Sequence, residues 1–237
     1  MSDSKIKVLI VVEGKKTEPR IMSHLFDCFG ISERHQIYSF KSNLYVLYQK
    51  MFLKSDPESY DLLQVLKEDA APEDEWKLDI NYSDVLLIFD LDPQDHYYNP
   101  DHVLQMLNYF KESSDMGKLY INYPMVESYY HMKTIPDPNY LSYSFPVTNL
   151  KSYKKHVGEI RKNNYDSYAR TQEECISLIQ ANITKAKLIT GENETGYIPD
   201  GDVIFQAMQN VMETRQVVPV LCTCVFYIWE YDYKLLS

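Results

Sequence analysis

The chain has 237 residues, enough for one elaborated domain or two small ones with a sizeable core. Hydrophobic residues make up 45% of it and charged residues 24%, as in ordinary globular proteins. The formal net charge of −10 argues against a protein that lives by non-specific duplex binding, although an acidic metal site and an acidic insert would contribute to that sum.

The strand over 6–12, "IKVLIVV", is a continuous apolar run, which is typical of a strand buried on both faces of a parallel sheet. We expect Thr17 to cap the helix that follows, with Pro19 in its first turn and Gly30 at its end.

A second strand is predicted over 35–40, and a helix begins at Ser42 or Asn43. Residues 54–84 then carry ten acidic residues and three lysines, with a short apolar helix around 62–66. We interpret this stretch as a surface insert with a solvated charged face.

The run "DVLLIFD" over 84–90 predicts a core strand, followed by a helix that begins at Asn99 and that Gly117 ends. A strand over 118–124 and a short helix over 125–132 come next. This alternation of strands and helices predicts an α/β fold with a mainly parallel sheet flanked by helices.

After about Pro136 the pattern changes to a mostly helical C-terminal region, so we divide the chain into residues 1–135 and 136–237. The elements expected there are a loop over 134–149, a basic helix over 151–163, a helix started by a Thr171–Glu174 capping box, a helix over 203–214, and a buried helix or strand from Val217.

Cysteine usage and apolar runs predict a reduced, cytoplasmic protein. The four cysteines are expected to be buried thiols, because the Cys222–Cys224 pair lacks the further ligands of a structural zinc site. The start "MSDSKIK" has no apolar signal core, and the longest apolar stretch, 217–229, is shorter than the roughly 20 residues that span a bilayer. No membrane association is expected.

Acidic residues follow three of the predicted strands: Glu13 before Gly14, the pair Asp90 and Asp92, and then Glu127. Ligands of open parallel sheets bind beyond the carboxyl ends of the strands, so we expect these acids to converge. Such a cluster would repel itself without a cation, and Mg²⁺ prefers oxygen ligands.

The stretches "VVEGKKTEP" and "LLIFDLD" resemble the Toprim domain, which has a Glu-Gly motif after one strand and Asp-x-Asp after a later one. The resemblance covers about residues 5–135. It implies that Glu13 is a general acid/base or metal ligand and that Asp90 and Asp92 bind metal. "EGKKTEP" and "NYPMVESYYHM" look more like the RloB-like phage-defence proteins, which carry an Asn-Pro-x-x-Glu-type motif. Asn122, Pro124 and Glu127 fit this motif loosely, because Tyr123 is interposed between Asn122 and Pro124, and the resemblance implies that Glu127 is an accessory acid.

The resemblance implies a Mg²⁺- or Mn²⁺-dependent nuclease, acting on RNA or DNA in anti-phage defence, with a partner ATPase or self-association. Lys15, Lys16 and Arg20 are candidates for holding phosphate, with the N-terminus of the following helix. Gly14 would allow the backbone to approach the substrate closely.

Other interpretations stay open for each residue. Glu13 can be an ordinary strand-end acid, Asp90 and Asp92 an Asx turn, and Glu127 a plain helix residue. The local or structural alternatives apply to further side chains: Glu18 and Asp95 as capping and turn residues, His131 as a packed histidine, His96 as a surface residue, and Lys151, Lys154, Lys155, Arg161 and Lys162 as a solvated helix face.

Two other functions fit the same sequence. One is nucleotidyl transfer on the same fold, which would need a nucleoside-triphosphate site and a template groove. The other is a non-catalytic module whose acidic insert contacts a partner.

Overall fold

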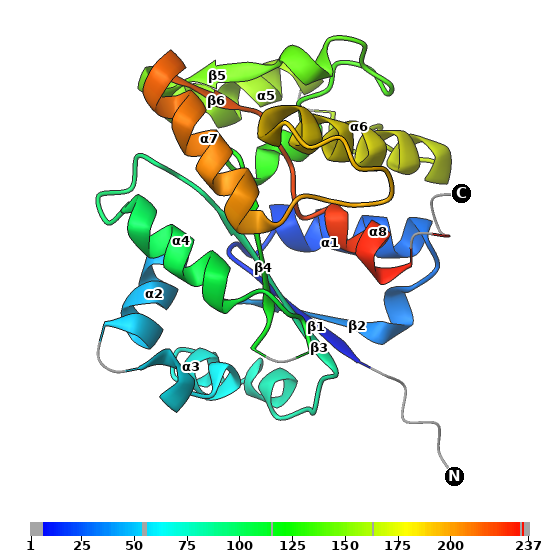
Figure 1. Ribbon diagram of the computed structural model, residues 1–237. Helices are drawn as coiled ribbons and strands as arrows, with labels where there is room; N and C mark the ends of the chain where they lie inside the picture. The colour runs from blue at the N-terminus through cyan, green and yellow to red at the C-terminus, as the bar shows by residue number, and fades with distance from the viewer. Residues whose placement is uncertain (1–6, 54–55, 115, 163, 233, 235–237) are drawn as a thin grey trace. The chain divides into compact units, whose positions relative to one another are not determined.

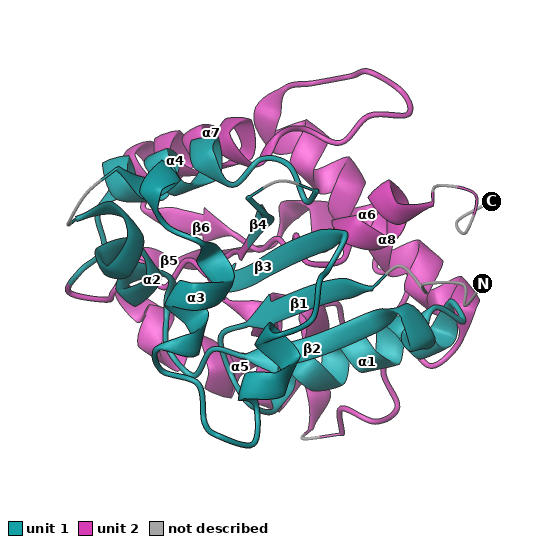
Figure 2. Cartoon of the chain, turned by 90° about the horizontal axis from the view of Figure 1, so that it is seen from below, with its two compact units in different colours: residues 1–89, 97–120 teal, residues 90–96, 121–237 magenta. Residues whose placement is uncertain are grey.

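The computed structural model describes residues 7–53, 56–114, 116–162, 164–232 and 234. Parts of several predictions lie outside the described residues: the start "MSDSKI" with Ile6 of the first strand, residues 54 and 55 of the insert, Asp115 of the helix that Gly117 was expected to end, and Asn163 of the basic helix. The chain forms two compact units (Figure 2). Unit 1 comprises residues 1–89 and 97–120, and unit 2 comprises residues 90–96 and 121–237.

The sheet has four strands, in the order β2-β1-β3-β4, and it is parallel. The strands are β1 (Val8–Val12), β2 (His35–Ser39), β3 (Asp84–Asp90) and β4 (Lys118–Asn122). This confirms the α/β class and the parallel sheet that the apolar runs predict, and β3 has the predicted bounds.

The order of the strands reverses direction between β1 and β3. The chain passes from β1 to β2 on one side of β1, and β3 and β4 then follow on its other side. In register, Val12 at the end of β1 pairs with Ser39 of β2 and with Ile88 of β3. All five residues of β1 are buried, as expected for a strand with neighbours on both sides.

Helices cover the strands of unit 1. They are α1 (Thr17–Cys28), α2 (Leu44–Phe52), α3 (Leu62–Lys67) and α4 (Pro100–Tyr109), with the short 3-10 helices η1 (Ser32–Arg34), η2 (Pro57–Ser59) and η3 (Glu75–Leu78). Helix α1 lies on one face of β1 and β2, and α3 lies on the other (Figures 1 and 2).

The helix boundaries of unit 1 correct two predictions. Thr17 is the first residue of α1 and Lys16 is its N-cap, with no side-chain cap. Helix α4 ends at Tyr109, well before Gly117, which lies with a φ of 105° in the turn before β4. Asn43, by contrast, caps α2 as predicted, since its side chain accepts a hydrogen bond from a backbone N–H in the first turn.

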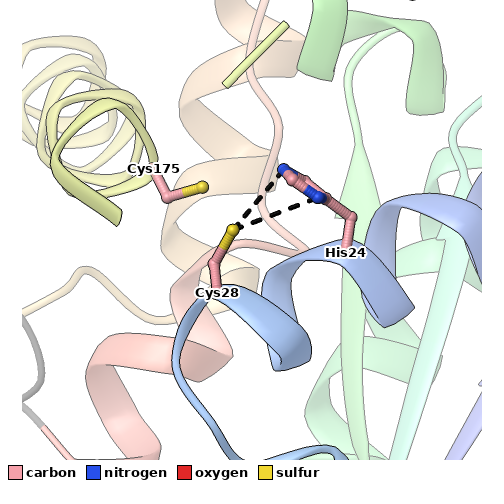
Figure 3. Close-up of side chains that lie close together, drawn as sticks. All are labelled: His24, Cys28 and Cys175. Atoms are coloured by element: carbon pink, nitrogen blue, oxygen red, sulfur yellow. Dashed lines mark hydrogen bonds between the residues drawn. The ribbon is translucent and has the colours of Figure 1, made fainter. Parts of the chain in front are cut away.

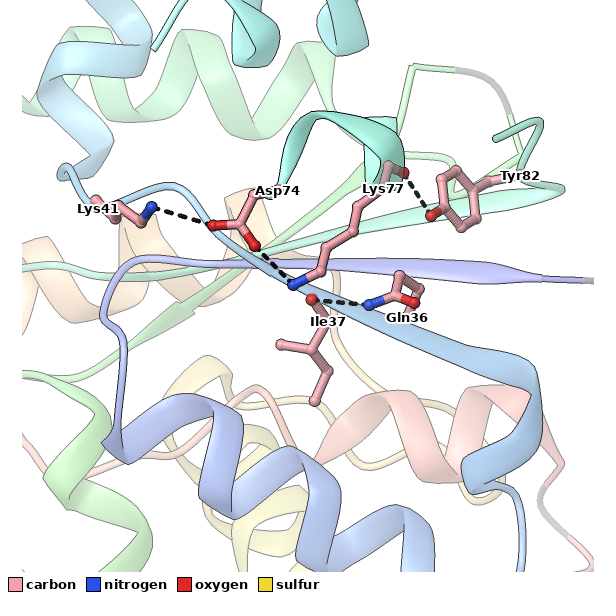
Figure 4. Close-up of polar contacts among 6 residues, drawn as sticks. All are labelled: Gln36, Ile37, Lys41, Asp74, Lys77 and Tyr82. Atoms are coloured by element: carbon pink, nitrogen blue, oxygen red, sulfur yellow. Dashed lines mark hydrogen bonds and ion pairs between the residues drawn. The ribbon is translucent and has the colours of Figure 1, made fainter. Parts of the chain in front are cut away.

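The acidic insert is tied down by ion pairs. Asp74 lies between two lysines, with Lys41 Nζ at 3.1 Å and Lys77 Nζ at 2.9 Å from its carboxylate oxygens (Figure 4). Further pairs join Lys50 to Glu68 and Asp69, and Lys67 to Asp79. Because Lys41 and Lys50 precede the insert, these ion pairs join three of its acids, Glu68, Asp69 and Asp74, to an earlier part of unit 1.

Unit 2 combines helices with a two-stranded antiparallel sheet. Its elements are η4 (Val126–Tyr130), η5 (Tyr140–Ser142), β5 (Ser144–Pro146), η6 (Val147–Ser152), α5 (Tyr153–Arg161), α6 (Gln172–Thr190), α7 (Gly201–Arg215), β6 (Val217–Pro219) and α8 (Phe226–Tyr231). The Thr171–Glu174 capping box is present.

Strands β5 and β6 correct the prediction of a loop over 134–149, and they pair through Phe145 and Val218. The run from Val217 was expected to be a buried helix or a strand. It starts as strand β6 and ends as helix α8, so each expectation is correct for part of the run. Among the described residues, no helix combines the length and the apolar character that crossing a membrane requires. The predicted boundary between residues 135 and 136 stays a prediction.

Candidate functional site

Glu13 directly follows β1 and is half-buried. Its carbonyl oxygen accepts a hydrogen bond from the Lys41 backbone N–H at 3.1 Å, so the turn after β1 is joined to the chain after β2. Lys15, Lys16 and Arg20, the predicted phosphate-binding residues, are all exposed on this turn and on the first turn of α1. Their positions leave them accessible to a ligand in solution.

The backbone N–H of Gly14 makes a hydrogen bond with a nearby side chain. Its N–H donates to Glu18 Oε1 at 3.1 Å, and the Glu18 residue is only 6% exposed. A Cβ at Gly14 would lie 2.8 Å from Glu18 Oε2, so the space beside the glycine holds this carboxylate. Glu18 thus makes a local contact, but with Gly14, which precedes the helix, and α1 has no side-chain cap. A side chain at position 14 would have to displace the end of the Glu18 side chain.

Three hydrogen bonds hold the acidic stretch after β3 against the stretch after β4. They run from Leu91 N to Asn122 O (3.1 Å), from Asp92 N to Pro124 O (3.2 Å) and from Val126 N to Asp90 Oδ1 (2.8 Å). The last of these caps η4 with the Asp90 carboxylate. Both aspartates are therefore fixed by backbone contacts within unit 2.

Asp92 has a strained backbone and a perturbed carboxylate. Its φ is 33°, in the left-handed region that most residues avoid. Burial raises the pKa of its carboxyl, the nearby charge of Asp95 raises it further, and a hydrogen bond from the Gln94 backbone opposes them. That bond makes an Asx turn at Asp92, and the Asp95 N–H donates to the Asp92 carbonyl at 2.9 Å, so Asp95 is a turn residue as predicted.

Glu127 lies in η4 and is 4% exposed. Its Oε1 is 2.8 Å from Lys154 Nζ, and the Lys154 side chain reaches it from α5 while staying 72% exposed. The ammonium balances a carboxylate that would otherwise be costly to bury. Because Asp90 caps the helix that carries Glu127, unit 2 brings together Asp90, Glu127 and Lys154.

Sequence reasoning left the role of Lys154 open within the basic stretch, and it missed the cap by Asp90. Lys154 is 27 positions after Glu127, and the Val126 N–H is 36 positions after Asp90, so no spacing rule joins either pair. Arg161 of the same basic stretch is a structural residue, since its Nη2 donates to the carbonyls of Met132 (2.6 Å) and Lys133 (2.9 Å).

The two histidines near the acids behave as packed and surface residues. His131 Nδ1 is 2.9 Å from the Tyr153 hydroxyl, and burial, with the charges of His156 and Lys185, lowers its pKa to about 3. His131 is therefore neutral at physiological pH. His96 is 77% exposed, with its Nδ1 3.7 Å from Asp95 Oδ1.

All four cysteines are thiols, as predicted, although Cys28 is only half-buried. Cys28 Sγ lies 3.6 Å from His24 Nε2, one turn earlier on α1 (Figure 3). Cys175, on α6, donates to the Ala169 carbonyl at 3.2 Å. Each of these two thiols therefore has a polar contact within its own unit.

No family model, curated protein or solved structure matches this chain. The resemblance to Toprim proteins therefore rests on the motifs at Glu13, Asp90 and Asp92 and on their places after the strands.

The predicted donors suit a hard divalent cation. Glu13, Asp90 and Asp92 offer carboxylate oxygens, the ligand type that Mg²⁺ and Mn²⁺ prefer. The Val126 N–H donates to Asp90 Oδ1 at 2.8 Å, and this contact fixes the orientation of the Asp90 carboxylate. The raised pKa of Asp92 marks a carboxylate whose ionised form a cation would stabilise.

Proposed function

We propose that this chain is a Toprim-type nuclease that cleaves phosphodiester bonds in RNA or DNA with Mg²⁺ or Mn²⁺. The observation that carries the proposal is the reversal of strand order between β1 and β3. Open parallel sheets bind ligands outside the carboxyl ends of the strands at such a reversal. Glu13 follows β1, Asp90 ends β3 and Asp92 comes two residues later, so both strands beside the reversal lead into carboxylates.

Glu13, Asp90 and Asp92 would hold the cation, which neutralises charge on the phosphate and lowers the pKa of a bound water. Glu13 is also the candidate general base for the attacking water. Asp90 serves as both ligand and cap, so its carboxylate orientation is fixed before substrate binds.

Glu127 and Lys154 form the accessory part of the site. Glu127 is buried and its carboxylate is 2.8 Å from the exposed ammonium of Lys154, which suits a lysine held in place to meet a phosphate. Lys15, Lys16 and Arg20 supply further positive charge on the turn after β1. A role in anti-phage defence, with a partner ATPase or self-association, belongs to the same proposal through the motif resemblance.

The test is cleavage of end-labelled RNA and DNA, single- and double-stranded, with Mg²⁺ or Mn²⁺. We expect Glu13→Gln, which removes the candidate general base, to lose about 100-fold or more of the cleavage rate. Asp92→Asn, which removes a proposed metal ligand, should lose about 10- to 100-fold. Glu73→Gln, which removes an exposed acid of the insert, is the matched control and should cleave like the wild type.

Equal cleavage by the wild type and both site variants would overturn the proposal, as would a wild type that cleaves none of these substrates. Incubation with labelled nucleoside triphosphates in parallel identifies nucleotidyl transfer on the same site.

A further inference from the structure

Cys222 and Cys224 form a buried dithiol in unit 2. Their residues are 0% and 1% exposed, and their Sγ atoms are 3.3 Å apart. A single residue, Thr223, separates the two thiols, and the chain turns at Cys224, where the Phe226 N–H donates to the Thr223 carbonyl at 2.9 Å. None of the roles proposed above uses this pair.

The segment 221–224 supports the chain after β4. Five hydrogen bonds join it to residues 121–128: Tyr123 N to Leu221 O (2.8 Å), Leu221 N to Tyr123 O (2.9 Å), Thr223 Oγ1 to Ile121 O (2.8 Å), Cys224 N to Asn122 Oδ1 (3.3 Å) and Ser128 Oγ to Leu221 O (3.3 Å). Residues 122–126 in turn hold Asp90, Leu91 and Asp92. A shift of the backbone at Cys222 and Cys224 would therefore disturb these hydrogen bonds and, through residues 122–126, the acidic stretch.

The geometry is close to that of a disulfide but does not meet it. A disulfide needs an S–S distance of about 2.05 Å, whereas the two Sγ atoms are 3.3 Å apart. Closing the bond therefore requires the two sulfur atoms to move closer, while Asn182 Oδ1 holds the Cys222 N–H at 2.8 Å.

We propose that Cys222 and Cys224 are a redox modification site, which a peroxide oxidises to an intrachain disulfide that loosens residues 121–128. The sulfur of one thiol attacks a peroxide oxygen and becomes a sulfenic acid, and the proton of that thiol leaves with the displaced hydroxide as water. The sulfur of the other thiol attacks the sulfenic sulfur, and its proton leaves with the displaced hydroxide as a second water. Two thiols and one hydrogen peroxide thus give one disulfide and two waters, and the sulfurs lose the two electrons that the peroxide gains.

The experiment treats the full chain with hydrogen peroxide, denatures it in an alkylating reagent, and maps its peptides by mass spectrometry. We expect the peptide that contains both cysteines to lose two hydrogens and to resist alkylation, and dithiothreitol to reverse both changes. Cys224→Ser should abolish the change, whereas Cys28→Ser should retain it. A wild type whose Cys222 and Cys224 stay alkylatable, or are oxidised only singly, would overturn the proposal.

Hydrogen exchange of the same samples tests the coupling without any activity assay. Oxidation should speed amide exchange in residues 121–128 and leave the exchange of α1 unchanged, and reduction should restore it. A disulfide that forms without faster exchange in 121–128 would refute the loosening. Because these readouts need no cleavage, they stand or fall separately from the proposed nuclease activity.

Discussion

The two compact units place their charged and polar groups differently. In unit 1, β1 is apolar throughout, and lysines and acids form ion pairs of partly exposed side chains, as Asp74 does with Lys41 and Lys77 (Figure 4). Unit 2 buries polar groups in its core, including Asn182 and Lys185, which are each 1% exposed.

Lys185 illustrates how unit 2 holds a buried charge. Its Nζ donates to the carbonyls of Tyr140 (2.8 Å) and Tyr143 (2.6 Å) and lies 4.5 Å from the centre of the Tyr140 ring. Burial lowers its pKa to about 7. Carbonyls and a ring face compensate only partly for lost water, whereas the ion-paired lysines of unit 1 keep 21–28% of their side-chain surface exposed.

The same residue types therefore contribute different amounts to the free energy of unfolding in the two units. A surface ion pair is worth at most about 1 kcal/mol, while a buried polar group that loses its partner costs about 1–3 kcal/mol. Asn182→Leu and Lys185→Met in unit 2, and Gly14→Ala and Asp74→Asn in unit 1, test this contrast.

The largest effect is expected for Asn182→Leu in unit 2. Asn182 Oδ1 accepts from the Cys222 N–H at 2.8 Å and the Tyr140 hydroxyl at 2.6 Å, so leucine would leave two buried donors without this acceptor. We expect the free energy of unfolding to fall by about 4 kcal/mol, measured by urea unfolding. The control is Gln180→Leu, on the exposed face of the same helix; a loss as small as the control's would break the contrast.

The next effect is a dependence on pH that Lys185 introduces. An unfolded lysine keeps its proton to near pH 10.5, whereas the folded one releases it near 7. Between these values the unfolded state binds more protons, so stability rises with pH. From pH 7 to 9, the unfolding free energy of the wild type minus that of Lys185→Met should rise by about 1.4 kcal/mol per pH unit at most. A flat difference would mean that Lys185 is not desolvated.

In unit 1, the turn at Gly14 should show a smaller, coupled effect. Gly14→Ala would push the Glu18 carboxylate away from the Gly14 N–H. We expect a loss of about 1 kcal/mol in the wild-type background and a smaller loss in the Glu18→Ala background. Equal losses in both backgrounds, by urea unfolding, would show that the contact contributes nothing.

The smallest effect is expected for Asp74→Asn, also in unit 1. Hydrogen bonds from Lys77 and Lys41 lower the pKa of the Asp74 carboxyl, so its contribution is present above pH 3.8 and is lost as the pH falls further. At neutral pH we expect a loss of about 0.5 kcal/mol, reduced further by 1 M salt. A salt-independent loss of more than about 2 kcal/mol in the free energy of unfolding would show that the Asp74 ion pairs behave like the buried polar groups of unit 2.

The local features of the fold could be predicted from the sequence. The bounds of β3, the Asn43 cap and the Thr171–Glu174 capping box each depend on residues within a few positions, where periodicity and side-chain chemistry decide the structure. The parallel sheet followed from its continuous apolar strands.

The predictions that the structure corrects concern residues whose partners are distant in sequence or whose local contacts compete. Strand β5 exists because Phe145 pairs with Val218, more than seventy positions later, and no local pattern reports that partner. Thr17 was expected to cap α1, but Glu18 reaches back to Gly14 instead. In the candidate site, the acids were found from their places after strands, while the pairing of Glu127 with Lys154 requires the fold of unit 2.

The central claim is that carboxylates at the ends of β1 and β3 bind a divalent cation. Calorimetric titration of the metal-free chain with Mn²⁺ tests it directly. We expect the wild type and Glu73→Gln to bind alike, and Glu13→Gln and Asp92→Asn each to weaken binding by about tenfold or more. Absence of Mn²⁺ binding by the wild type, or equal binding by Asp92→Asn, would contradict the claim.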